Sequence, residues 1–594
     1  AACPLLLGKI NMTTNTYNQL VSSTFCDNAI RSVMMIDDEF ITYADSIKAL
    51  QGQIKLDGKK LDSSKRAALL ESFFQSKKMV CDIDDGVASL DADRIRKSDL
   101  IIIDYHLEKD SPDKTLFVLN KLKDSEHLNM VVVYTRENME TVWLQIASML
   151  RGAYDLNSRL INYDNEDIIT YWNDVILPDL NSGGGYSLSR PEIVSYIQTG
   201  KTIGRIKGIL SRNDDITDPK DRDFIADLIC EYYIQSSNNL NDAQDACNVN
   251  GDRNGIKWLQ IGNIFVTLYR KEVDSYENDA ENIWNTLNES LCEWKPSYYQ
   301  LLKSEIQNKI EAEALSFNIH LANDIYGQAA WLNEIIKTDN VSVKNEKIDV
   351  IFGNLSEELY IKLRKNPELK QFINSVFDAY KQDFDACAET DTLKYCAAQM
   401  KLPTNQNIVF QDMYHALNMN LSSRNYEEKH ISTGTVFWDT DNNNWYLCVS
   451  AACDMVPTQG NDPHHERLSP HRLIKVLQLF PVKPDKALPL AHHSKYIYAY
   501  DKDERKYFSI LKEGKDLPVV DYMIILNHGH NVTDLSKGKA KAVVWKNTNG
   551  DIEKLTLNIK LKSQLRTGYA ERYQAIASQY SARIGVDYIS VALP

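Results

Sequence analysis

The sequence predicts a multidomain protein with an N-terminal α/β domain, a helical middle and a mostly antiparallel β-rich C-terminal domain that ends in a helix. The first observation is the length of 594 residues, which exceeds the ~100–200 residues of a typical domain. The second is a series of short apolar runs that alternate with helical patterns from residue 30 to about 154. The third is a change to short, aromatic-rich runs after Gly434. We place an N-terminal extension at 1–29, the α/β domain at 30–185, the helical domain at 186–425 and the β-rich domain at 426–594.

The α/β domain is predicted from continuous apolar runs separated by amphipathic stretches. The strand candidates are SVMMIDD, MVCDIDD, LIIIDYH and NMVVVYT. Continuous apolar strands separated by helices are typical of a parallel sheet that is covered on both faces. We therefore predict a doubly wound parallel sheet. The preceding segment begins with AACPLLLGKIN, which is too short in apolar residues for a secretory signal, and we expect it to be an extension.

The middle of the chain is predicted to be helical because apolar residues recur three and four positions apart. The clearest stretches are 223–235, 263–287, 298–321 and 356–384. The run Gly183-Gly184-Gly185 precedes this region, and we expect it to be a flexible joint. After Gly434, short alternating runs lie between turn signals such as DTDNNN and NTNGD, which predicts antiparallel strands, with a closing helix near 563–583.

Composition excludes several classes of protein. The net charge is −15, which argues against a protein whose whole surface binds nucleic acid or an anionic membrane. No apolar run approaches the ~18 residues of a membrane-spanning helix. Ten cysteines are scattered without a CxxC pair, which favours reduced thiols in the cytoplasm over a disulfide framework.

The C-terminal end is basic although the chain as a whole is acidic. Residues 532–594 hold ten basic and five acidic side chains, a net charge of +5. We interpret this surface first as a solvated, lysine-rich sheet edge that discourages aggregation. A docking surface for an acidic partner or for nucleic acid stays open, and this is the only region for which we consider nucleic acid.

Acidic and hydroxyl side chains follow three of the predicted strands. Asp37 and Asp38 follow the first apolar run, Asp104 ends a later one, and Thr135 ends the next. Because ligands of wound α/β sheets bind at the carboxyl ends of the strands, these side chains should converge. Carboxylate oxygens without histidine or thiolate suit Mg²⁺.

With these strand-end residues, the N-terminal quarter of the chain resembles the receiver domain of bacterial response regulators. The resemblance implies that Asp37, Asp38 and Asp104 bind Mg²⁺ together with the backbone carbonyl of His106. It also implies that Asp104 accepts phosphate from a histidine kinase and that the hydroxyl of Thr135 contacts the phosphoryl oxygens. These roles are chemically coherent, because a carboxylate that attacks a phosphoryl group needs positive charge nearby.

The same resemblance implies a lysine at the end of the fifth strand. The segment from Arg136 to Gly200 contains no lysine, and Arg159 lies at about the expected distance, so we take Arg159 as the candidate cation. An arginine fork is not equivalent to a lysine point charge. Two versions of the domain therefore stay open, one that is phosphorylated and a degenerate one that serves only for docking.

The C-terminal region carries a second group of chemically active side chains. Seven of the twelve histidines lie between His464 and His530, and Cys453-Asp454 precede them. Their spacing matches no metal-binding or catalytic motif. We therefore predict a cytoplasmic bacterial regulator of two-component signalling whose output lies in protein contacts, with a histidine kinase or an ATPase as partner. The alternative is a nuclease-like effector enzyme of a stress or phage-defence system, with its active site in the β domain.

Overall fold

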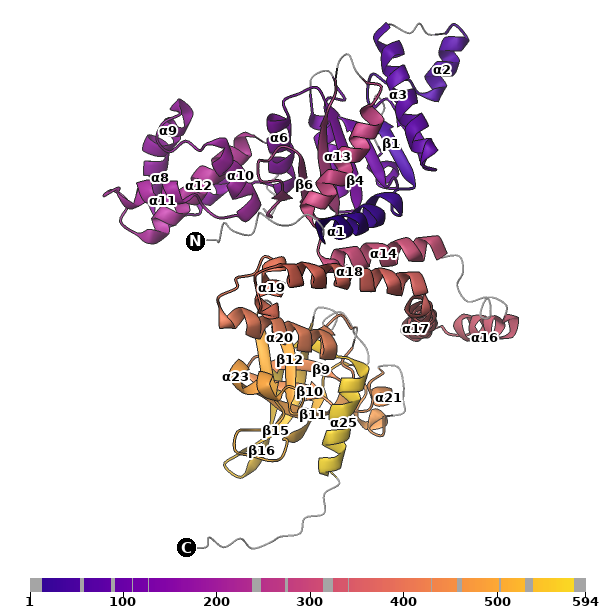
Figure 1. Cartoon of the computed structure of the whole chain (residues 1–594). Coiled ribbons are helices and arrows are strands. Elements are labelled where there is room, and N and C mark those ends of the chain that lie inside the picture. The colour runs from indigo at the N-terminus through magenta and orange to yellow at the C-terminus, as the bar shows by residue number, and fades with distance from the viewer. Residues whose placement is uncertain are drawn as a thin grey trace. The chain divides into compact units, whose positions relative to one another are not determined.

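The computed structural model divides into two compact units (Figure 1). Unit 1 comprises Ala1–Phe317 and Glu358–Cys387, and unit 2 comprises Asn318–Glu357 and Ala388–Pro594. The structure describes residues 13–53, 58–86, 91–108, 111–125, 128–237, 247–272, 276–313, 324–339, 341–428, 430–456, 462–501, 504–528 and 538–581.

Unit 1 is built on a seven-stranded sheet with the order β2-β1-β3-β4-β7-β6-β5. The strands are β1 Ser32–Ile36, β2 Val80–Asp84, β3 Leu100–Asp104, β4 Asn129–Thr135, β5 Asn250–Gly251, β6 Trp258–Ile261 and β7 Ile264–Arg270. The five strands from β2 to β7 in this order are parallel, whereas β6 and β5 extend the sheet in antiparallel pairing. The parallel part has the 2-1-3-4-5 strand order of flavodoxin-like doubly wound sheets.

Both faces of this sheet are buried, because successive side chains of a strand point to opposite faces. Ile101 and Ile103 of β3 belong to one hydrophobic core, whereas Leu100 and Ile102 belong to the other. The first core also contains side chains of α5 Asp113–Lys123, α6 Met139–Arg151, α10 Arg190–Thr199 and α12 Pro219–Ser236. The second contains side chains of α1 Thr13–Ser22, α3 Gly58–Ser76, α13 Asp279–Trp294 and α18 Pro367–Ala386. The predicted doubly wound sheet is confirmed.

The N-terminal segment is part of this unit. Helix α1 and the π-helical turn η2 Ser23–Asp27 supply Tyr17, Val21 and Phe25 to the second core. In unit 1, α14 Tyr298–Glu313 follows α13, and α18 comes later in the chain. The hydroxyl of Tyr17 lies 3.3 Å from that of Tyr380 on α18, so this segment packs against the folded unit.

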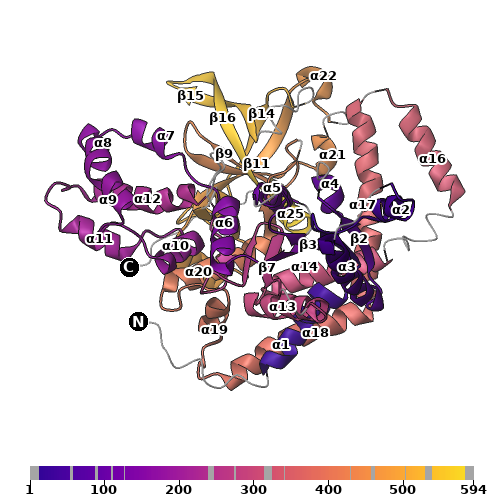
Figure 2. The ribbon, with the colours of Figure 1, turned by 90° about the horizontal axis from the view of Figure 1, so that it is seen from above.

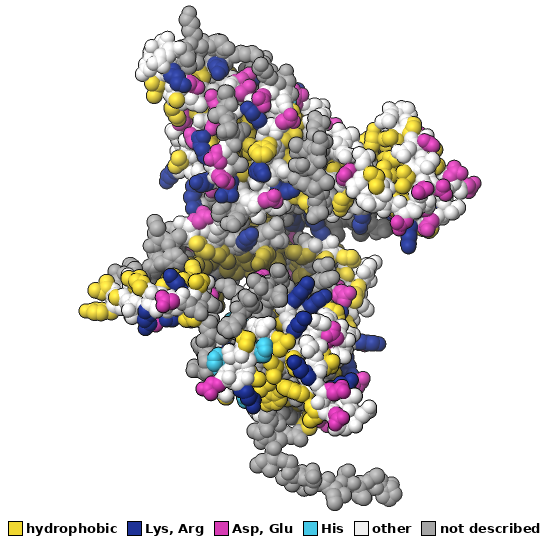
Figure 3. Space-filling view, turned by 180° about the vertical axis from the view of Figure 1, so that it is seen from behind, with side chains coloured by type: hydrophobic (Ala, Val, Ile, Leu, Met, Phe, Trp, Pro, Cys, Tyr) yellow, Lys and Arg dark blue, Asp and Glu magenta, His cyan; other side chains and the backbone are white. Residues whose placement is uncertain are grey.

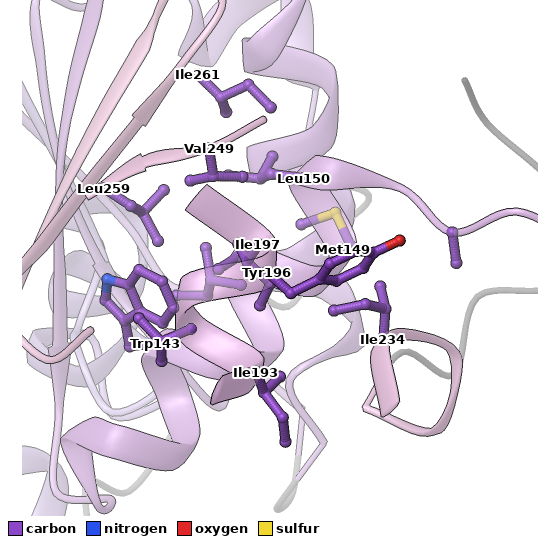
Figure 4. Packing of buried hydrophobic residues seen from close by; sticks show 14 of the residues in the cluster. Trp143, Met149, Leu150, Ile193, Tyr196, Ile197, Ile234, Val249, Leu259 and Ile261 are labelled. Carbon is purple, nitrogen blue, oxygen red and sulfur yellow. The ribbon is translucent and has the colours of Figure 1, made fainter. Parts of the chain in front are cut away.

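A helical insertion separates β4 from the next parallel strand. It contains α6, α7 Leu156–Ile161, α8 Glu166–Tyr171, η3 Trp172–Ile176, α9 Leu177–Ser182, α10, α11 Gly204–Ser211 and α12. Helices α7 to α12 lie together at the β5 end of the sheet, whereas α2 Tyr43–Leu50 and α3 lie at the β2 end (Figures 1 and 2). Within the insertion, Tyr196 and Ile197 of α10 share a core with Trp143 of α6 and with Leu259 of β6 (Figure 4).

Two sequence predictions for this region are wrong in detail. The stretch 263–287 was expected to be helical, but it contains β7 before α13 begins at Asp279. The run Gly183-Gly184-Gly185 was expected to be a flexible joint, but Gly183 caps α9 in the left-handed conformation, where glycine is favoured. The carboxylate of Asp179 then accepts the backbone N–H groups of Gly185 and Tyr186 at 3.2 and 2.8 Å, which fixes this turn.

Unit 2 confirms the predicted antiparallel β domain with a closing helix. Its strands are β8 Ser423–Asn425, β9 Thr435–Asp439, β10 Asn444–Cys448, β11 Arg472–Pro481, β12 Tyr496–Asp501, β13 Glu504–Ser509, β14 Val520–Ile525, β15 Lys539–Thr548 and β16 Asp551–Leu565. The path β10-β9-β16-β15-β14-β11 returns to β10 through the β10–β11 pairing, so six strands close into a ring. One hydrophobic core includes Phe437, Val476 and Leu557 from this ring.

The helices of unit 2 cover the outside of this ring or precede it. They are α16 Ile325–Ile336, the first part of α17 Val341–Lys365, α19 Thr392–Gln399, α20 Asn407–Ser422, α21 Ala452–Met455, α22 His465–Leu468, α23 Pro484–Ala487 and the closing helix α25 Thr567–Ser581. Ala570, Tyr573 and Ala577 of α25 share a second core with residues of β9, β10 and β11.

The described part of the chain contains no helix that is both long and apolar enough to cross a membrane. On the face of unit 1 seen in Figure 3, acidic and basic side chains are interspersed. That visible surface therefore carries no extended region of one charge.

Candidate functional site

Three carboxylates meet at the carboxyl edge of the parallel strands in unit 1. Asp37 and Asp38 follow β1, and Asp104 ends β3, the strand that pairs directly with β1. One carboxylate oxygen from each lies within 4.8 Å of those from the other two. Among the described residues, this is the one group of three histidine, cysteine or acidic side chains close enough to share a metal ion. The predicted convergence of these aspartates is therefore what the structure shows.

Backbone hydrogen bonds hold these side chains in place. The N–H of Asp37 donates to the carbonyl of Asp84 at 3.2 Å, and one carboxylate oxygen of Asp37 accepts the N–H of Glu39 at 3.0 Å. The hydroxyl of Thr115, from the first turn of α5, donates to the carbonyl of Asp104 at 2.8 Å. The strand ends are thus anchored by the neighbouring loops and by α5.

A buried lysine that was not expected from the sequence completes this site. Lys271 follows β7, and its ammonium lies 2.7 Å from a carboxylate oxygen of Asp37 and 2.8 Å from one of Asp104. The Lys271 side chain is 4% exposed, and its backbone N–H donates to the carbonyl of Thr135 at 2.7 Å. Its ammonium also lies 4.9 Å from the ring centroid of Tyr134, within the range of a cation–π interaction.

Burial and like charges perturb the pKa values of the cluster. Burial, and then the charge of Asp37, raises the pKa of Asp104 to about 7, although Lys271 opposes this shift. Burial, followed by the charges of Asp37 and Glu39, also raises the pKa of Asp38. Burial by itself would lower the pKa of Lys271, but the charges of Asp37 and Asp104 outweigh it and raise that pKa. Lys271 is therefore held as an ammonium ion.

The charge balance of this cluster fits a divalent cation. Three carboxylates and one ammonium leave two negative charges when all are ionised, and the carboxylates are the hard oxygen ligands that Mg²⁺ prefers. Asp37, Asp38 and Asp104 can therefore hold Mg²⁺. Ionised carboxylates at this spacing repel one another, and this repulsion adds to burial in raising the pKa values of Asp38 and Asp104.

Thr135 lies at the same edge of the sheet. It ends β4, its strand partner is Arg270, and its side chain is buried and accepts the N–H of Glu137 at 3.1 Å. Strand β4 lies between β3 and β7. Thr135, at the end of β4, is therefore flanked by the strand that ends in Asp104 and by the strand that precedes Lys271.

Arg159 lies away from the aspartates, whereas His106 stays near Asp104 in the chain. His106 lies two residues after Asp104 in the chain and is half-buried. Its ring centroid lies 5.0 Å from that of Tyr105. Arg159 lies on α7 in the insertion, where it forms a 2.7 Å ion pair with Asp227 and lies over the rings of Tyr154 and Phe224. The structure thus pairs Lys271, and not Arg159, with the aspartates.

The reason for this difference is the insertion between β4 and β7. The fifth parallel strand does not follow β4 in the next helical crossover but comes after α12, β5 and β6. The run IFVTLYRK at 264–271 carries the signal, because it is an apolar strand pattern that ends in basic residues. A search confined to 136–200 could not find it.

A buried polar network lies behind Lys271. The hydroxyl of Tyr134 donates to the carboxylate of Asp279, at the start of α13, and the hydroxyl of Tyr269 donates to the same carboxylate at 3.2 Å. The guanidinium of Arg66 on α3 lies 3.6 Å from Asp279 and 5.7 Å from the Tyr134 ring. This network joins β4, β7, α3 and α13 directly behind the strand ends.

In unit 2, the histidines and Cys453 do not form such a cluster among the described residues. His528 is fully buried and bonded to the carbonyl of Ile431 at 3.1 Å, and burial lowers its pKa to about 3. Cys453 is exposed, with its thiol 3.3 Å from the carboxylate of Asp454. His530 lies outside the described residues.

Comparison with known families identifies the N-terminal part. Residues 29–185 match the response receiver domain family, which confirms the predicted resemblance for this part of the chain. The matched residues and the predicted α/β domain both end at residue 185. Strand β7, which supplies the fifth parallel strand, and Lys271, which follows it at the site, come later in the chain. No curated protein and no solved structure matched the chain.

Proposed function

We propose that unit 1 accepts a phosphoryl group on Asp104 and that the chain converts this modification into altered protein contacts. The receiver domain itself indicates a signalling or regulatory protein. The observation that carries the finer proposal is the position of Lys271, whose ammonium bridges Asp37 and Asp104 at 2.7 and 2.8 Å. Lys271 therefore supplies the positive charge that a phosphorylated receiver needs, the role for which Arg159 was the candidate.

The side chains divide the chemistry between them. A carboxylate oxygen of Asp104 attacks phosphorus, the bond from phosphorus to the donor breaks, and an acyl phosphate forms. Asp37 and Asp38, together with Asp104 and the carbonyl of His106, would hold Mg²⁺, which supplies positive charge to the phosphoryl oxygens when bound. Lys271 supplies a second positive charge from a buried position, where it is little screened by water.

Thr135 and Tyr134 offer a route from this site to the rest of unit 1. The Thr135 hydroxyl is proposed to turn toward the new phosphoryl oxygens, which removes its bond with the N–H of Glu137. Tyr134 is the adjacent residue, and its hydroxyl binds Asp279 on α13. Phosphorylation would therefore bias the packing of β4 and α13, a local charge event with a distant effect.

The proposal implies a partner that supplies phosphate, and we name a histidine kinase in a bacterial cytoplasm, with an ATPase as the second candidate. In the first case the phosphorus–nitrogen bond of a phosphohistidine breaks as the phosphorus–oxygen bond to Asp104 forms. Asp104 would accept the phosphoryl group either from this donor or from a small acyl phosphate.

Acetyl phosphate with Mg²⁺ tests the proposal on the full chain. Intact-mass spectrometry should show the gain of one phosphoryl group in the wild type and none in D104N. The variant K271M should lose most of the acceptance, whereas R159Q should retain it, because Arg159 pairs with Asp227 away from the aspartates. A wild type that binds Mg²⁺ but gains no phosphate, and that also fails to bind beryllofluoride, would reject phospho-acceptance and leave a docking domain.

A further inference from the structure

The outward face of β15 and β16 in unit 2 carries lysines and exposed aromatic side chains but no acidic residue. Ala542, Leu557 and Ile559 point into the core of the strand ring, so the alternate positions face outward. These outward positions are Lys539, Lys541, Val543, Trp545 and Asn547 on β15, and Ile552, Lys554, Thr556, Asn558 and Lys560 on β16. This face is strongly basic in a chain whose net charge is −15.

The strand register places these side chains in rows across the sheet. Lys560 lies between Lys539 on one side and Trp438 of β9 on the other. Further along the same ribbon, Lys554 pairs with Trp545. Since a strand rises about 3.3 Å per residue, the two rows lie about 20 Å apart along β16. The basic and aromatic positions therefore form a strip and not a single point.

At one end of the strip, two ammonium groups converge on one indole ring. The irregularity between Leu561 and Ser563 leaves Lys562 outside the strand register. The ammonium groups of Lys560 and Lys562 lie 5.6 and 5.4 Å from the Trp438 ring centroid. This end of the strip therefore carries two positive charges beside one aromatic ring.

The other end of the strip offers aromatic surface to solvent. Trp545 is 54% exposed and Tyr522 of β14 is 49% exposed. Ile524 pairs with Val543, so Tyr522, two residues away from Ile524, shares the outward face with Trp545. Exposed indole and phenol rings among lysines are the surface on which nucleic-acid bases stack.

Protection of a sheet edge, the first interpretation of this basic region, does not explain the end of the strip that carries Lys541 and Lys560. β16 pairs with β15 and β9, and β15 pairs with β16 and β14. At Lys541 and Lys560 the strands have a neighbouring strand on either side, whereas Trp545 and Lys554 pair with each other in the hairpin of β15 and β16. The acidic side chain beside this face is Asp441, which is bonded to the N–H and the amide of Asn558.

We propose that this strip binds single-stranded nucleic acid, with the lysines on the phosphates and with Trp545 and Tyr522 stacked on bases. A length of about 20 Å is suited to the short site sizes, from about 4 nucleotides, of small β-barrels that bind single strands. A peptide made only of acidic residues would use the lysines but has no aromatic groups to stack on the two exposed rings. The aromatic content of the strip therefore favours nucleic acid.

Fluorescence anisotropy of labelled oligo-dT and oligo-U with the full-length protein tests this proposal. W545A should weaken binding by about 5- to 100-fold, because one base–aromatic stack is lost, and W545F should restore most of it. K560Q/K562Q should weaken binding and reduce the steepness of its salt dependence by about 1.4 in log–log slope, since two phosphate contacts disappear. K483Q/K495Q removes the same charge from exposed positions off the strip and should bind like the wild type.

Three outcomes would overturn the proposal. One is wild-type binding weaker than about 100 µM at low salt, the weak limit of non-specific nucleic-acid binding. Another is an equal loss in K483Q/K495Q and K560Q/K562Q, which would reduce the effect to total charge. The third is tighter binding of a poly-glutamate peptide than of either oligonucleotide, which would assign the strip to an acidic protein. All of these readouts are independent of the modification of Asp104.

Discussion

Replacing Lys271 with methionine removes the one ammonium group that the structure places among three aspartates. The Lys271 side chain is 4% exposed and contacts two carboxylates at 2.7 and 2.8 Å. Loss of one partner from a buried ion pair costs about 3–5 kcal/mol, since the remaining charges stay desolvated. For a unit of this size the melting temperature should fall by about 10 °C.

Mg²⁺ should reverse much of this loss. Without Lys271 the ionised cluster carries three negative charges instead of two, so a divalent cation gains more by binding there. We expect the rise in melting temperature on adding Mg²⁺ to be larger for K271M than for the wild type. The measurement is differential scanning calorimetry of the full chain at about pH 8, where Asp104, with its pKa of about 7, is largely ionised.

The matched control is R151M in the same unit. Arg151 and Glu231 form a buried ion pair at 2.7 Å, with side chains 4% and 0% exposed, and the pair lies in the helical insertion. R151M should lose a similar amount of stability and gain none of it back with Mg²⁺. The reasoning fails if K271M melts like the wild type, or if Mg²⁺ raises the melting temperatures of K271M and R151M equally.

Three further predictions concern buried polar groups, each measured by denaturant unfolding of the full chain. Because burial raises the pKa of Asp104 to about 7, the metal-free wild type should lose about 3 kcal/mol relative to D104N as pH rises from about 5 to about 8; parallel pH profiles would contradict this. Because burial lowers the pKa of His528 to about 3, unit 2 of the wild type should lose about 3 kcal/mol relative to H528Q as pH falls from about 7 to about 4.5; an unchanged difference would show that His528 is not buried in its neutral form. Finally, Y134F should lower the free energy of unfolding of unit 1 by about 2 kcal/mol, because a hydrogen bond to the Asp279 carboxylate is lost, and a neutral effect would remove Tyr134 from the proposed route to α13.

The insertion lengthens the connection to the fifth parallel strand of unit 1. Five parallel strands and their edge residues form the candidate site, but the fifth strand reaches the sheet only after helices α6 to α12 and the antiparallel strands β5 and β6. Trp143 on α6 donates to the carbonyl of Trp258 on β6 at 2.9 Å, which ties the insertion to the sheet.

Local sequence determined much of the fold. Runs such as LIII and MVVV specify buried parallel strands because every side chain is apolar, and the period of two in β15 and β16 specifies strands with one buried face. The positions of Asp37, Asp38, Asp104 and Thr135 followed from the same logic, since parallel strands place their carboxyl ends at one edge.

Only the tertiary structure decided which strand lies beside β4. The segment at 264–270 mixes apolar residues at helical and strand spacings when it is extended to 287, and the pairing partner that makes it a strand lies far away in the chain. The cation of the site depends on that pairing, so Lys271 could not be assigned from its neighbours in sequence. The burial that raises the pKa of Asp104, and the ring closure that places Lys541 and Lys560 between neighbouring strands, likewise arise from contacts between distant segments.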